Sequence, residues 1–334
     1  SSMSKKVSIA DIANALGLSR NTVSKALNGS PGITHETRQR ILDQAVRMNY
    51  KMMGTQLSIS KTAEAASILL VCKENQLVST FFGPLILQIQ HIVRTKGAVI
   101  TMQYMSPEEM KAGIVPSQIY SAFGVIGLEI LDSNYIRHLV NCGKPCVFFD
   151  CATDADEITT PFDVVLQDER GLYSAIDALF NKGYTRFGFV GDPNHCAGFR
   201  NRYDYFRLAL ADHGQLEPEK YSILHPDEAM RQPGAYLKAL QASSLPEMFV
   251  CANDTIAINL LKAMQEYEAT SSEKIRLVVF EMSHDMVDQE KLMASVNLSR
   301  KQIAAGLCML LFDRIQNPTT TKRCIKLESL VEVF

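Results

Sequence analysis

The sequence predicts a small all-α helix-turn-helix headpiece at residues 1–50, joined by a linker at residues 51–66 to an α/β body at residues 67–334. Three short amphipathic patterns fill the headpiece, a polar stretch without periodicity follows, and apolar strand-like runs then alternate with helical stretches. At ~150 residues per domain, the chain is too long for one compact core. We therefore expect the body to form two doubly wound subdomains with parallel sheets.

The first headpiece helix is predicted from the residues at its ends. Ser8 followed three residues later by Asp11 is typical of a capping box, in which each side chain accepts a hydrogen bond from the other residue's backbone. Gly17 is expected to end the helix, because glycine adopts the left-handed conformation easily. Between these ends, apolar side chains recur at helical spacing and predict one buried stripe, formed by Ile9, Ile12, Ala13 and Leu16.

Two further headpiece helices follow. Ser19 is expected to cap a helix over residues 20–27 that Asn28 and Gly29 end, and Thr34 is expected to start the third helix. The side chains predicted to face inward are Val23, Ala26 and Leu27, then Ile41, Leu42, Ala45 and Met48. On the third helix, Arg38, Arg40 and Arg47 are expected to stay in solvent.

Charge is distributed unevenly along the chain. Residues 1–62 hold nine Lys or Arg against three acids, whereas the remaining 272 residues hold 25 bases and 33 acids. A basic module on an acidic body suggests that only the first segment meets a polyanion, since clustered positive charge favours phosphates through counterion release. The alternative is an ordinary solvated charged face.

A helix, a tight turn and a second short polar helix form a helix-turn-helix arrangement, whose second helix enters the major groove of DNA. On that helix Arg20, Asn21 and Lys25 point away from the apolar face, and their side chains suit pairing with guanine and adenine. Phosphate contacts are expected from Ser8, Ser19, Thr22, Ser24 and Thr34, near the helix starts. A three-helix domain that binds protein is the alternative.

The body is predicted from the alternation of strand-like and helix-like runs. The strand-like runs are SILLVC, AVITMQY, FGVIGL, PCVFFD, FDVVLQ, RFGFVG, EMFVCA and IRLVVF, and amphipathic stretches separate most of them. Strand, helix and strand on this scale predict parallel sheets with helices on both faces. The succession exceeds one sheet of ordinary size, and ligands are expected at the carboxyl ends of the strands.

Composition predicts the compartment. No apolar run approaches the ~18 to 20 residues of a membrane span, and the opening residues lack the apolar core of a signal peptide. The eight cysteines contain no C-x-x-C pair, and Cys72, Cys146 and Cys251 lie in strand-like runs, which indicates a reducing cytosol. We expect a cytoplasmic protein without a membrane partner.

The usual catalytic motifs are absent from the sequence. It contains no G-x-G-x-x-G after the first strand, no Walker motif, no G-x-S-x-G elbow and no H-E-x-x-H, and its seven histidines are dispersed. We therefore expect no catalytic residues, no metal and no cofactor. An enzyme whose site residues converge from distant segments is the alternative.

The segment VSIADIANALGLSRNTVSKALNGSPGITHETRQRILDQAVRMNY closely resembles the headpiece of the LacI/GalR family of bacterial transcription regulators. By this resemblance the base-reading positions are Arg20, Asn21 and Lys25. The body is similar to the family's periplasmic-binding-protein-like sensor domain, in segments such as ALFNKGYTRFGFVG, VCANDTIAINLLKAM and LSRKQIAAGLCMLL. The resemblance implies an N-subdomain of about 67–160 and 298–316 and a C-subdomain of about 161–297 and 317–334.

The linker departs from the family pattern. In the family this segment folds into a hinge helix on operator DNA, where a leucine wedges into the minor groove. The nearest equivalent is Ile59, or Leu57 if the register slips, but Met52 and Met53 replace the usual Pro-Asn.

The resemblance also implies a small effector, such as a sugar or nucleobase derivative, bound between the subdomains. Asp150, Arg202, Asn253 and Glu281 fall on family ligand positions, and their groups suit hydroxyls. Phe81 and Phe82 are candidates for a flat apolar wall. The alternatives are helix or turn capping for Asp150 and Asn253, a surface ion pair for Arg202 and core packing for the phenylalanines. Glu281 stands where the family usually has aspartate.

The predicted function is therefore a sequence-specific transcriptional regulator, a repressor of the LacI/GalR type, whose affinity for double-stranded operator DNA depends on its effector. A homodimer is expected, with a tetramer left open, and Leu85, Ile89 and Ile92 belong either to the dimer face or to the core. The rival function is a cytosolic sugar-binding or sugar-modifying protein with an accessory DNA-binding arm. A bacterial nucleoid location follows from the resemblance.

Overall fold

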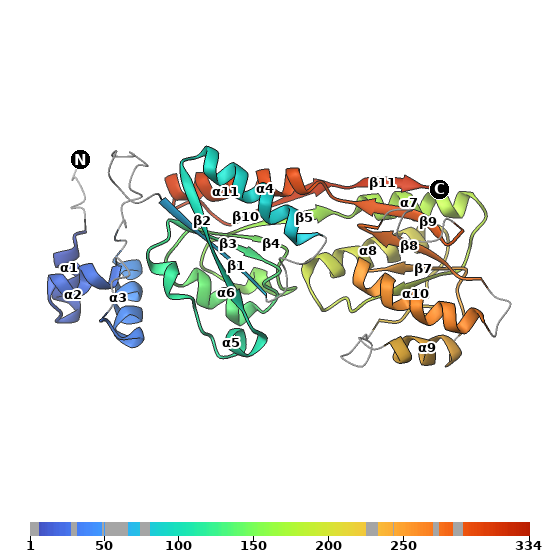
Figure 1. Cartoon of the computed structure of the whole chain (residues 1–334), viewed down its shortest axis with the longest axis horizontal. Coiled ribbons are helices and arrows are strands. Elements are labelled where there is room, and N and C mark those ends of the chain that lie inside the picture. Colours follow the sequence, from blue (N-terminus) through green and yellow to red (C-terminus); the bar gives the residue numbers. More distant parts are fainter. Residues whose placement is uncertain are drawn as a thin grey trace. The chain divides into compact units, whose positions relative to one another are not determined.

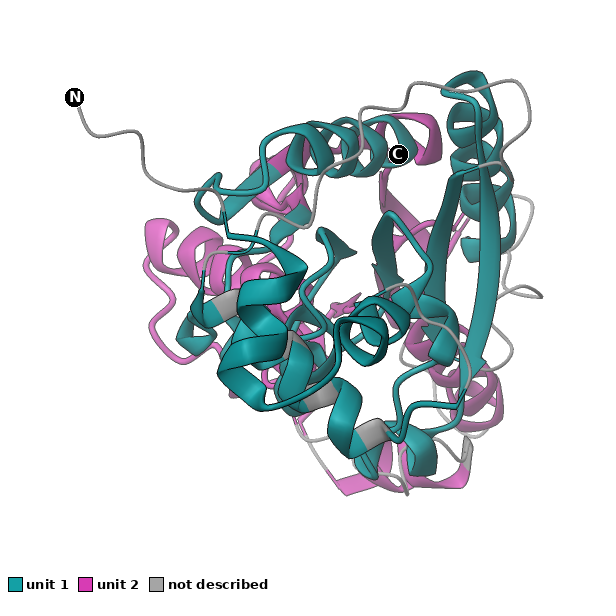
Figure 2. Cartoon of the chain, turned by 90° about the vertical axis from the view of Figure 1, so that its left-hand side faces the viewer, with its two compact units in different colours: residues 1–165, 303–325 teal, residues 166–302, 326–334 magenta. Residues whose placement is uncertain are grey.

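The computed structural model describes residues 7–27, 32–48, 50, 66–73, 81–224, 233–242, 244–269, 274–282 and 290–334. The chain divides into two compact units, which Figure 2 distinguishes by colour. Unit 1 comprises residues 1–165 and 303–325, and unit 2 comprises residues 166–302 and 326–334. The chain thus passes from one unit to the other after Val165, after Gln302 and after Ile325.

These three passages lie inside regular elements. Strand β5 (Asp163–Asp168), helix α11 (Arg300–Gln316) and strand β10 (Arg323–Glu328) each extend across one of them. The family resemblance placed the divisions five to nine residues earlier, after about residues 160, 297 and 316, where the chain lies between elements. The difference arises because the backbone hydrogen bonding of each element continues through the division.

The headpiece consists of α1 (Ile9–Leu16), α2 (Arg20–Leu27) and α3 (His35–Arg47). The predicted capping box is confirmed, since Ser8 Oγ accepts from the Asp11 amide and Asp11 Oδ2 accepts from the Ser8 amide at 2.7 Å. Gly17 ends α1 in the left-handed conformation, with φ of 66°. A small apolar core holds the helices together, with Ile12, Val23, Ala26 and Ile41 fully buried.

Arg38 corrects one expectation about α3. Its side chain is buried rather than solvated, with 7% of the residue exposed. Its Nη1 donates to the Ala26 carbonyl oxygen at 2.8 Å, in the last turn of α2. A cation at this end of a helix interacts favourably with the carbonyl groups that lack helical partners. Arg40 and Arg47 are exposed, as expected.

Within the described residues, the first sheet has six strands in the order β10-β5-β4-β3-β1-β2. Neighbouring strands from β5 to β2 are parallel. The remaining strands are β1 (Ala66–Lys73), β2 (Ala98–Met105), β3 (Gly124–Leu128) and β4 (Cys146–Phe149). The helices are α4 (Phe82–Thr95), α5 (Pro107–Lys111) and α6 (Ser133–Val140), with short 3-10 turns at Ser117–Tyr120 and Ala155–Glu157.

Helices cover both faces of this sheet, as the alternation predicted. Figure 1 shows α4 and α11 on one side of it and α5 and α6 on the other. The open question about α4 is settled for two residues, because Leu85 and Ile89 are fully buried in the core of unit 1. Ile92 is half-buried.

The second sheet has, in the described part of the chain, five strands in the order β11-β9-β8-β7-β6. They are β6 (Phe187–Val190), β7 (Met248–Cys251), β8 (Arg276–Phe280), β9 (Leu292–Asn297) and β11 (Leu330–Val333). Strands β6 to β9 are parallel, whereas β11 runs antiparallel to β9, which the sequence analysis did not predict. The helices are α7 (Arg170–Asn181), α8 (Ala197–Asp212), α9 (Pro233–Ala242) and α10 (Asp254–Glu268).

The helices of unit 2 form two pairs. Helix α7 packs against α8, and α9 packs against α10. Strands β6, β7 and β8 are parallel, so their carboxyl ends lie at one edge of the sheet. Helix α8 follows β6 there, and α10 follows β7. This edge is where a ligand site is expected in a doubly wound sheet.

Candidate functional site

Helix α2 presents the three side chains expected to contact bases. Arg20, Asn21 and Lys25 are all exposed, while Val23 and Ala26 on the opposite face are fully buried. The polar face of α2 is therefore held outward by the packing of its apolar face. Side chains of these types on an exposed helix face suit hydrogen bonding to base edges in the major groove.

The residues expected to contact phosphates lie at helix starts. Ser19 Oγ accepts from the Thr22 amide at 3.0 Å, and Thr34 Oγ1 accepts from the Thr37 amide at 3.2 Å. Ser8 Oγ also donates to Asp11 Oδ2 at 2.6 Å. These hydroxyls therefore act as helix caps, a role that the sequence analysis gave to all three. Ser24 lies half-buried on α2.

The hinge candidates Leu57 and Ile59 lie outside the described residues. The minor-groove contact expected of them stays a prediction from the family resemblance.

In unit 1, Asp150 directly follows β4 and adopts a left-handed backbone conformation, with φ of 62°. This conformation is uncommon for a residue other than glycine, and such residues cluster at functional sites. Its Oδ1 accepts from the Cys151 amide at 2.7 Å, so the turn-capping alternative also describes it. Glu129, which directly follows β3, has a φ of 56° and was missed by the sequence analysis.

Three phenylalanine rings form a cluster in unit 1. The centroids of Phe81 and Phe82 lie 5.1 Å apart, and both rings contact Phe149, with centroid distances of 5.9 and 6.4 Å. All three residues are half-buried. Phe149 is the last residue of β4 and Asp150 follows it directly, so the cluster lies at the same end of this strand as Asp150. Phe149 was not predicted, since it belongs to an apolar strand-like run.

In unit 2, Arg202 projects from α8 and its side chain is only 14% exposed. Its Nε donates to Glu169 Oε1 at 3.0 Å, its Nη2 donates to Gln167 Oε1 at 2.8 Å, and its Nη1 donates to the Ala252 carbonyl oxygen. The guanidinium carbon lies 3.9 Å from the centre of the Phe280 ring. The surface ion-pair alternative is wrong, because the Glu169 side chain that pairs with Arg202 is fully buried.

Asn253 and Glu281 flank these contacts, since they directly follow Ala252 and Phe280. Asn253 is the N-cap of α10, where its Oδ1 accepts from the Ile256 amide at 2.8 Å. Capping therefore uses the side-chain carbonyl oxygen of Asn253, and its side-chain NH₂ group is a hydrogen-bond donor. Arg202 thus lies close to Asn253 and Glu281, at the carboxyl ends of β7 and β8.

Glu281 has a left-handed φ of 59°. Its Oε1 accepts from the Leu298 amide at 2.5 Å, and its Oε2 lies 3.8 Å from Arg300 Nη2. Burial raises the pKa of the Glu281 carboxyl above its ordinary value of 4.5, although the Leu298 amide and the charge of Arg300 oppose this shift. The extra methylene relative to aspartate thus allows the carboxylate to reach the turn before α11.

The structure brings the predicted effector residues together in two groups, one in each unit. Phe81, Phe82 and Asp150 belong to unit 1, and Arg202, Asn253 and Glu281 belong to unit 2. The sequence analysis missed Gln167, Glu169 and Phe280, which hold Arg202. The polar residues that directly follow the apolar run VVL were the available indication for Gln167 and Glu169.

Two features are absent from the described residues. No group of three or more His, Cys, Asp or Glu side chains there is arranged to hold a metal ion. None of the described helices is both long and apolar enough to cross a membrane. All cysteines are free thiols, and burial raises the pKa of the Cys72 thiol to about 12.

Comparison with known proteins identifies two family matches. Residues 8–52 match the family described as bacterial regulatory proteins, lacI family, and residues 176–332 match the periplasmic binding protein-like domain. The chain is 24% identical to the HTH-type transcriptional regulator GalR of Lacticaseibacillus casei, over 96% of both chains.

Solved structures resemble the whole chain. A complex of the transcriptional regulator CelR with cellobiose has a TM-score of 0.66 at 20% identity and covers 98% of this chain and 99% of its own. A lac repressor dimer bound to operator and the anti-inducer ONPF has a TM-score of 0.65 at 18% identity and covers 99% of this chain and 98% of its own. At these identities the likeness demonstrates the fold.

Proposed function

Because the chain is a LacI-family transcriptional regulator with a periplasmic-binding-protein-like domain, we propose that it binds operator DNA as a homodimer under the control of a small effector. The observation that carries the DNA-binding role is α2, whose Arg20, Asn21 and Lys25 are exposed above a buried apolar face. We further propose residues 1–50 as the headpiece and 51–66 as the hinge. The protein acts at the nucleoid in the bacterial cytoplasm, where operator DNA lies.

The headpiece divides its contacts between bases and phosphates. Arg20, Asn21 and Lys25 hydrogen-bond to base edges in the major groove, and the helix starts at Ser8, Ser19 and Thr34 face phosphates, with Thr22 and Ser24 close by on α2. Two headpieces related by a two-fold axis bind the two halves of a near-palindrome. Leu57 or Ile59 wedges into the minor groove and kinks the DNA there.

The effector is a hydroxyl-rich small molecule such as a sugar. Arg202 and the Asn253 amide donate hydrogen bonds, Asp150 and Glu281 accept them, and Phe81 and Phe82 contact an apolar ring face. The positive charge of Arg202 is already matched by the buried Glu169 carboxylate, which favours an uncharged ligand. Effector and DNA then affect one another's affinity reciprocally, typically by ~1 to 3 kcal/mol.

Exposed apolar side chains on α4 and β2 support the homodimer. Leu87 is 65% exposed, Val99 is 43% exposed and Tyr104 is 38% exposed. Helix α4 packs against β2, which is an edge strand of its sheet. An apolar patch beside an uncovered strand edge is typical of an interface between subunits. Replacing Leu87 and Tyr104 by charged residues should shift the sedimentation of the protein from dimer to monomer.

Selection of duplexes from a random pool tests the DNA-binding role. The full chain should enrich a near-palindromic sequence with nanomolar affinity at a stated salt concentration. Arg20→Ala should cost about 1 to 3 kcal/mol on this sequence and relax base choice at one position of each half-site. Enrichment of no sequence, or an Arg20→Ala variant that binds as the parent chain does, would refute the proposal.

Thermal shift against uncharged sugars and nucleobases tests the effector role. A ligand present at 100 times its Kd should stabilise the protein by about 2.7 kcal/mol. Arg202→Ala and Asn253→Ala should abolish the shift, and the same ligand should change operator affinity. A ligand that shifts both variants as it shifts the parent chain binds elsewhere.

A further inference from the structure

The guanidinium of Arg202 is held by unit 2 at each of its three nitrogens. Nε, Nη1 and Nη2 donate to Glu169, to the Ala252 carbonyl and to Gln167, and the Phe280 ring lies against the guanidinium at 3.9 Å. A planar group bound along its edge and packed on one face has a single orientation. The candidate effector contact is therefore preorganised before any ligand arrives.

Gln167 extends these contacts away from the site. The residue is only 5% exposed, and its side-chain amide is engaged at both ends. Oε1 accepts from Arg202 Nη2 at 2.8 Å, and Nε2 donates to Ser329 Oγ at 2.7 Å. Ser329 Oγ in turn donates to the Asp168 carbonyl oxygen at 2.8 Å. Along this series of hydrogen bonds, each residue donates to the next one. Each hydrogen bond therefore polarises and strengthens its neighbour.

Two residues of this hydrogen-bond series, Gln167 and Ser329, lie in segments that connect the two units. Gln167 lies in β5, two residues after the passage at Val165. Ser329 lies between β10 and β11, four residues after the passage at Ile325. Of the three connecting segments, two are thus hydrogen-bonded to Arg202 or to its direct partner.

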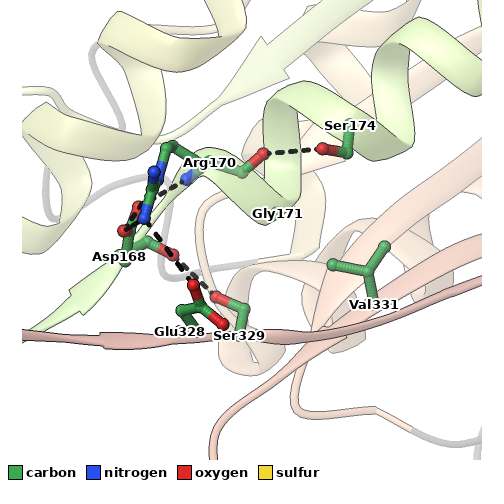
Figure 3. Close-up of a pocket in the computed structure, with 7 residues that line it drawn as sticks. All are labelled: Asp168, Arg170, Gly171, Ser174, Glu328, Ser329 and Val331. Atoms are coloured by element: carbon green, nitrogen blue, oxygen red, sulfur yellow. Dashed lines mark hydrogen bonds and ion pairs between the residues drawn. The ribbon is translucent and has the colours of Figure 1, made fainter.

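Ser329 lies close to the start of α7 and also lines a pocket. Figure 3 shows Ser329 beside Asp168 and below the first turn of α7, at a pocket of about 430 Å³. A Cβ added at Gly171 would lie 2.7 Å from Val331 Cγ2 and 3.1 Å from Ser329 Cβ. Helix α7 therefore packs directly on the β10–β11 segment, where Ser329 receives the hydrogen bond from Gln167.

We propose that Gln167 and Ser329 are positioning residues that hold Arg202 and couple it to β5 and to the β10–β11 segment. The consequence for regulation rests on the proposed function. An effector that displaces the Arg202 guanidinium pulls on Gln167 and Ser329, and so acts on two of the connecting segments. Changes at Gln167 or Ser329 then alter the link between effector and DNA without touching either ligand.

Nuclear magnetic resonance of the full chain, labelled with ¹⁵N-arginine and without added ligand, tests the positioning role. Arg202→Lys identifies the Arg202 guanidinium signals by their loss. Gln167→Met keeps the side-chain volume and removes both hydrogen bonds, so rotation about the Arg202 Nε–Cζ bond should become about tenfold faster, which corresponds to about 1.4 kcal/mol. Melting curves confirm that each variant is folded.

Ser329→Ala is the decisive variant, because Ser329 does not contact Arg202. It should accelerate the same rotation at least threefold by releasing the far end of Gln167. Ser174→Ala is the matched control, since Ser174 lines the same pocket but donates to the Arg170 carbonyl, and it should change the rate less than twofold.

A Ser329→Ala rate equal to that of Ser174→Ala would overturn the proposal, as would an unchanged rate in Gln167→Met. If Ser329→Ala does not fold, Gln167→Glu provides the second test. This variant keeps the acceptor for Arg202 and loses the donor to Ser329. Rotation about the Arg202 Nε–Cζ bond should therefore stay slow, while hydrogen exchange of the β10–β11 backbone amides becomes faster. An unchanged exchange there would also refute the coupling. Because no DNA or effector is present, failure of the proposed function would appear in the operator selection instead.

Discussion

A buried arginine fixes the position of the proposed recognition helix. Arg38 on α3 donates to the Ala26 carbonyl at 2.8 Å, and this atom belongs to the last turn of α2. A hydrogen bond from a charged donor contributes more than one between neutral groups, at ~1.5 to 3 kcal/mol. The packing of α2 on α3 therefore depends on a polar contact as well as on Val23 and Ile41.

Arg38→Met should weaken the headpiece by about 2 kcal/mol, because it leaves the Ala26 carbonyl without this donor. Hydrogen exchange of the α2 amides in the full chain measures the effect and should rise about tenfold or more. Arg40→Met removes the same charge from an exposed position on the same helix and should change exchange little. Equal exchange in the two variants would contradict the role of Arg38.

At the residue scale, the sequence predicted contacts between neighbouring residues but not contacts between distant ones such as Arg38 and Ala26. The caps at Ser8, Ser19 and Thr34 were predicted because a cap and its helix are adjacent in sequence. The burial of Arg38 was missed because its partner lies twelve residues away and is a backbone atom, which carries no sequence information. Gln167 and Glu169 were missed for the same reason, since only the fold brings Arg202 to them.

Glu281 should make the stability of unit 2 depend on pH. Burial raises the pKa of its carboxyl in the folded chain above the ordinary 4.5, so the folded chain binds more protons than the unfolded chain between the two values. Stability then falls as pH rises through that window, and it stays lower above it. Glu281→Gln keeps the acceptor for the Leu298 amide and removes the titrating group.

Urea unfolding of both proteins between pH 4 and pH 7 measures this dependence. Relative to the parent chain, Glu281→Gln should gain stability as pH rises. Glu328→Gln is the control, because the Glu328 side chain is 88% exposed. If the stabilities of Glu281→Gln and the parent chain depend on pH in the same way, burial does not shift the pKa of the Glu281 carboxyl.

At the scale of elements, α7 requires a glycine where it meets the β10–β11 segment. Gly171→Ala places a methyl group 2.7 Å from Val331 Cγ2, which forces the helix or the strand to shift. Overpacking of this kind typically costs about 1 to 3 kcal/mol. Gly234→Ala is the matched control, because Gly234 is also the second residue of its helix and no described neighbour lies within 4 Å of the added Cβ. Thermal unfolding should therefore separate the two variants, and equal melting temperatures would contradict the close approach.

Most of the strands that the sequence predicted are buried, although β2 is largely half-buried and the buried strand β9 was missed. Runs such as ILLVC in β1 and FGFV in β6 are apolar throughout, because helices cover both sides of a parallel sheet. Strands β10 and β11 escaped prediction because they alternate between half-buried and exposed residues. Their place in the two sheets depends on β5 and β9, which lie far away in the sequence.

At the scale of the whole molecule, the repeated alternation of strands and helices predicted two doubly wound sheets. The family resemblance placed the passages between the units in the stretches between elements, whereas they lie inside β5, α11 and β10. β5 illustrates this, because its apolar run is continuous through the passage at Val165 and ends only at Gln167.

On the unit 1 side, one buried carboxylate joins the three segments that lead to unit 2. Asp163 of β5 is fully buried, and it accepts from Arg314 of α11 at 2.7 and 2.8 Å and from Arg323 of β10 at 2.9 and 3.0 Å. Burial by itself raises the pKa of Asp163, but the hydrogen bonds from the two arginines outweigh it and leave the pKa below 3.8. The connecting segments thus share one electrostatic anchor.

Asp163→Asn should cost about 3 to 5 kcal/mol, because it leaves the buried Arg314 without its counter-charge. Asp156→Asn breaks the ion pair with Lys322 at a carboxylate that is 98% exposed, so it should cost at most about 1 kcal/mol. Because the pKa of Asp163 is lowered, its contribution is complete above the unfolded pKa and is lost as pH falls through the folded pKa. Urea unfolding should therefore show the largest difference between Asp163→Asn and the parent chain at neutral pH, with the difference shrinking in acid. A difference that is small at pH 7, or that grows as the pH falls, would show that the three segments are held together by apolar packing instead.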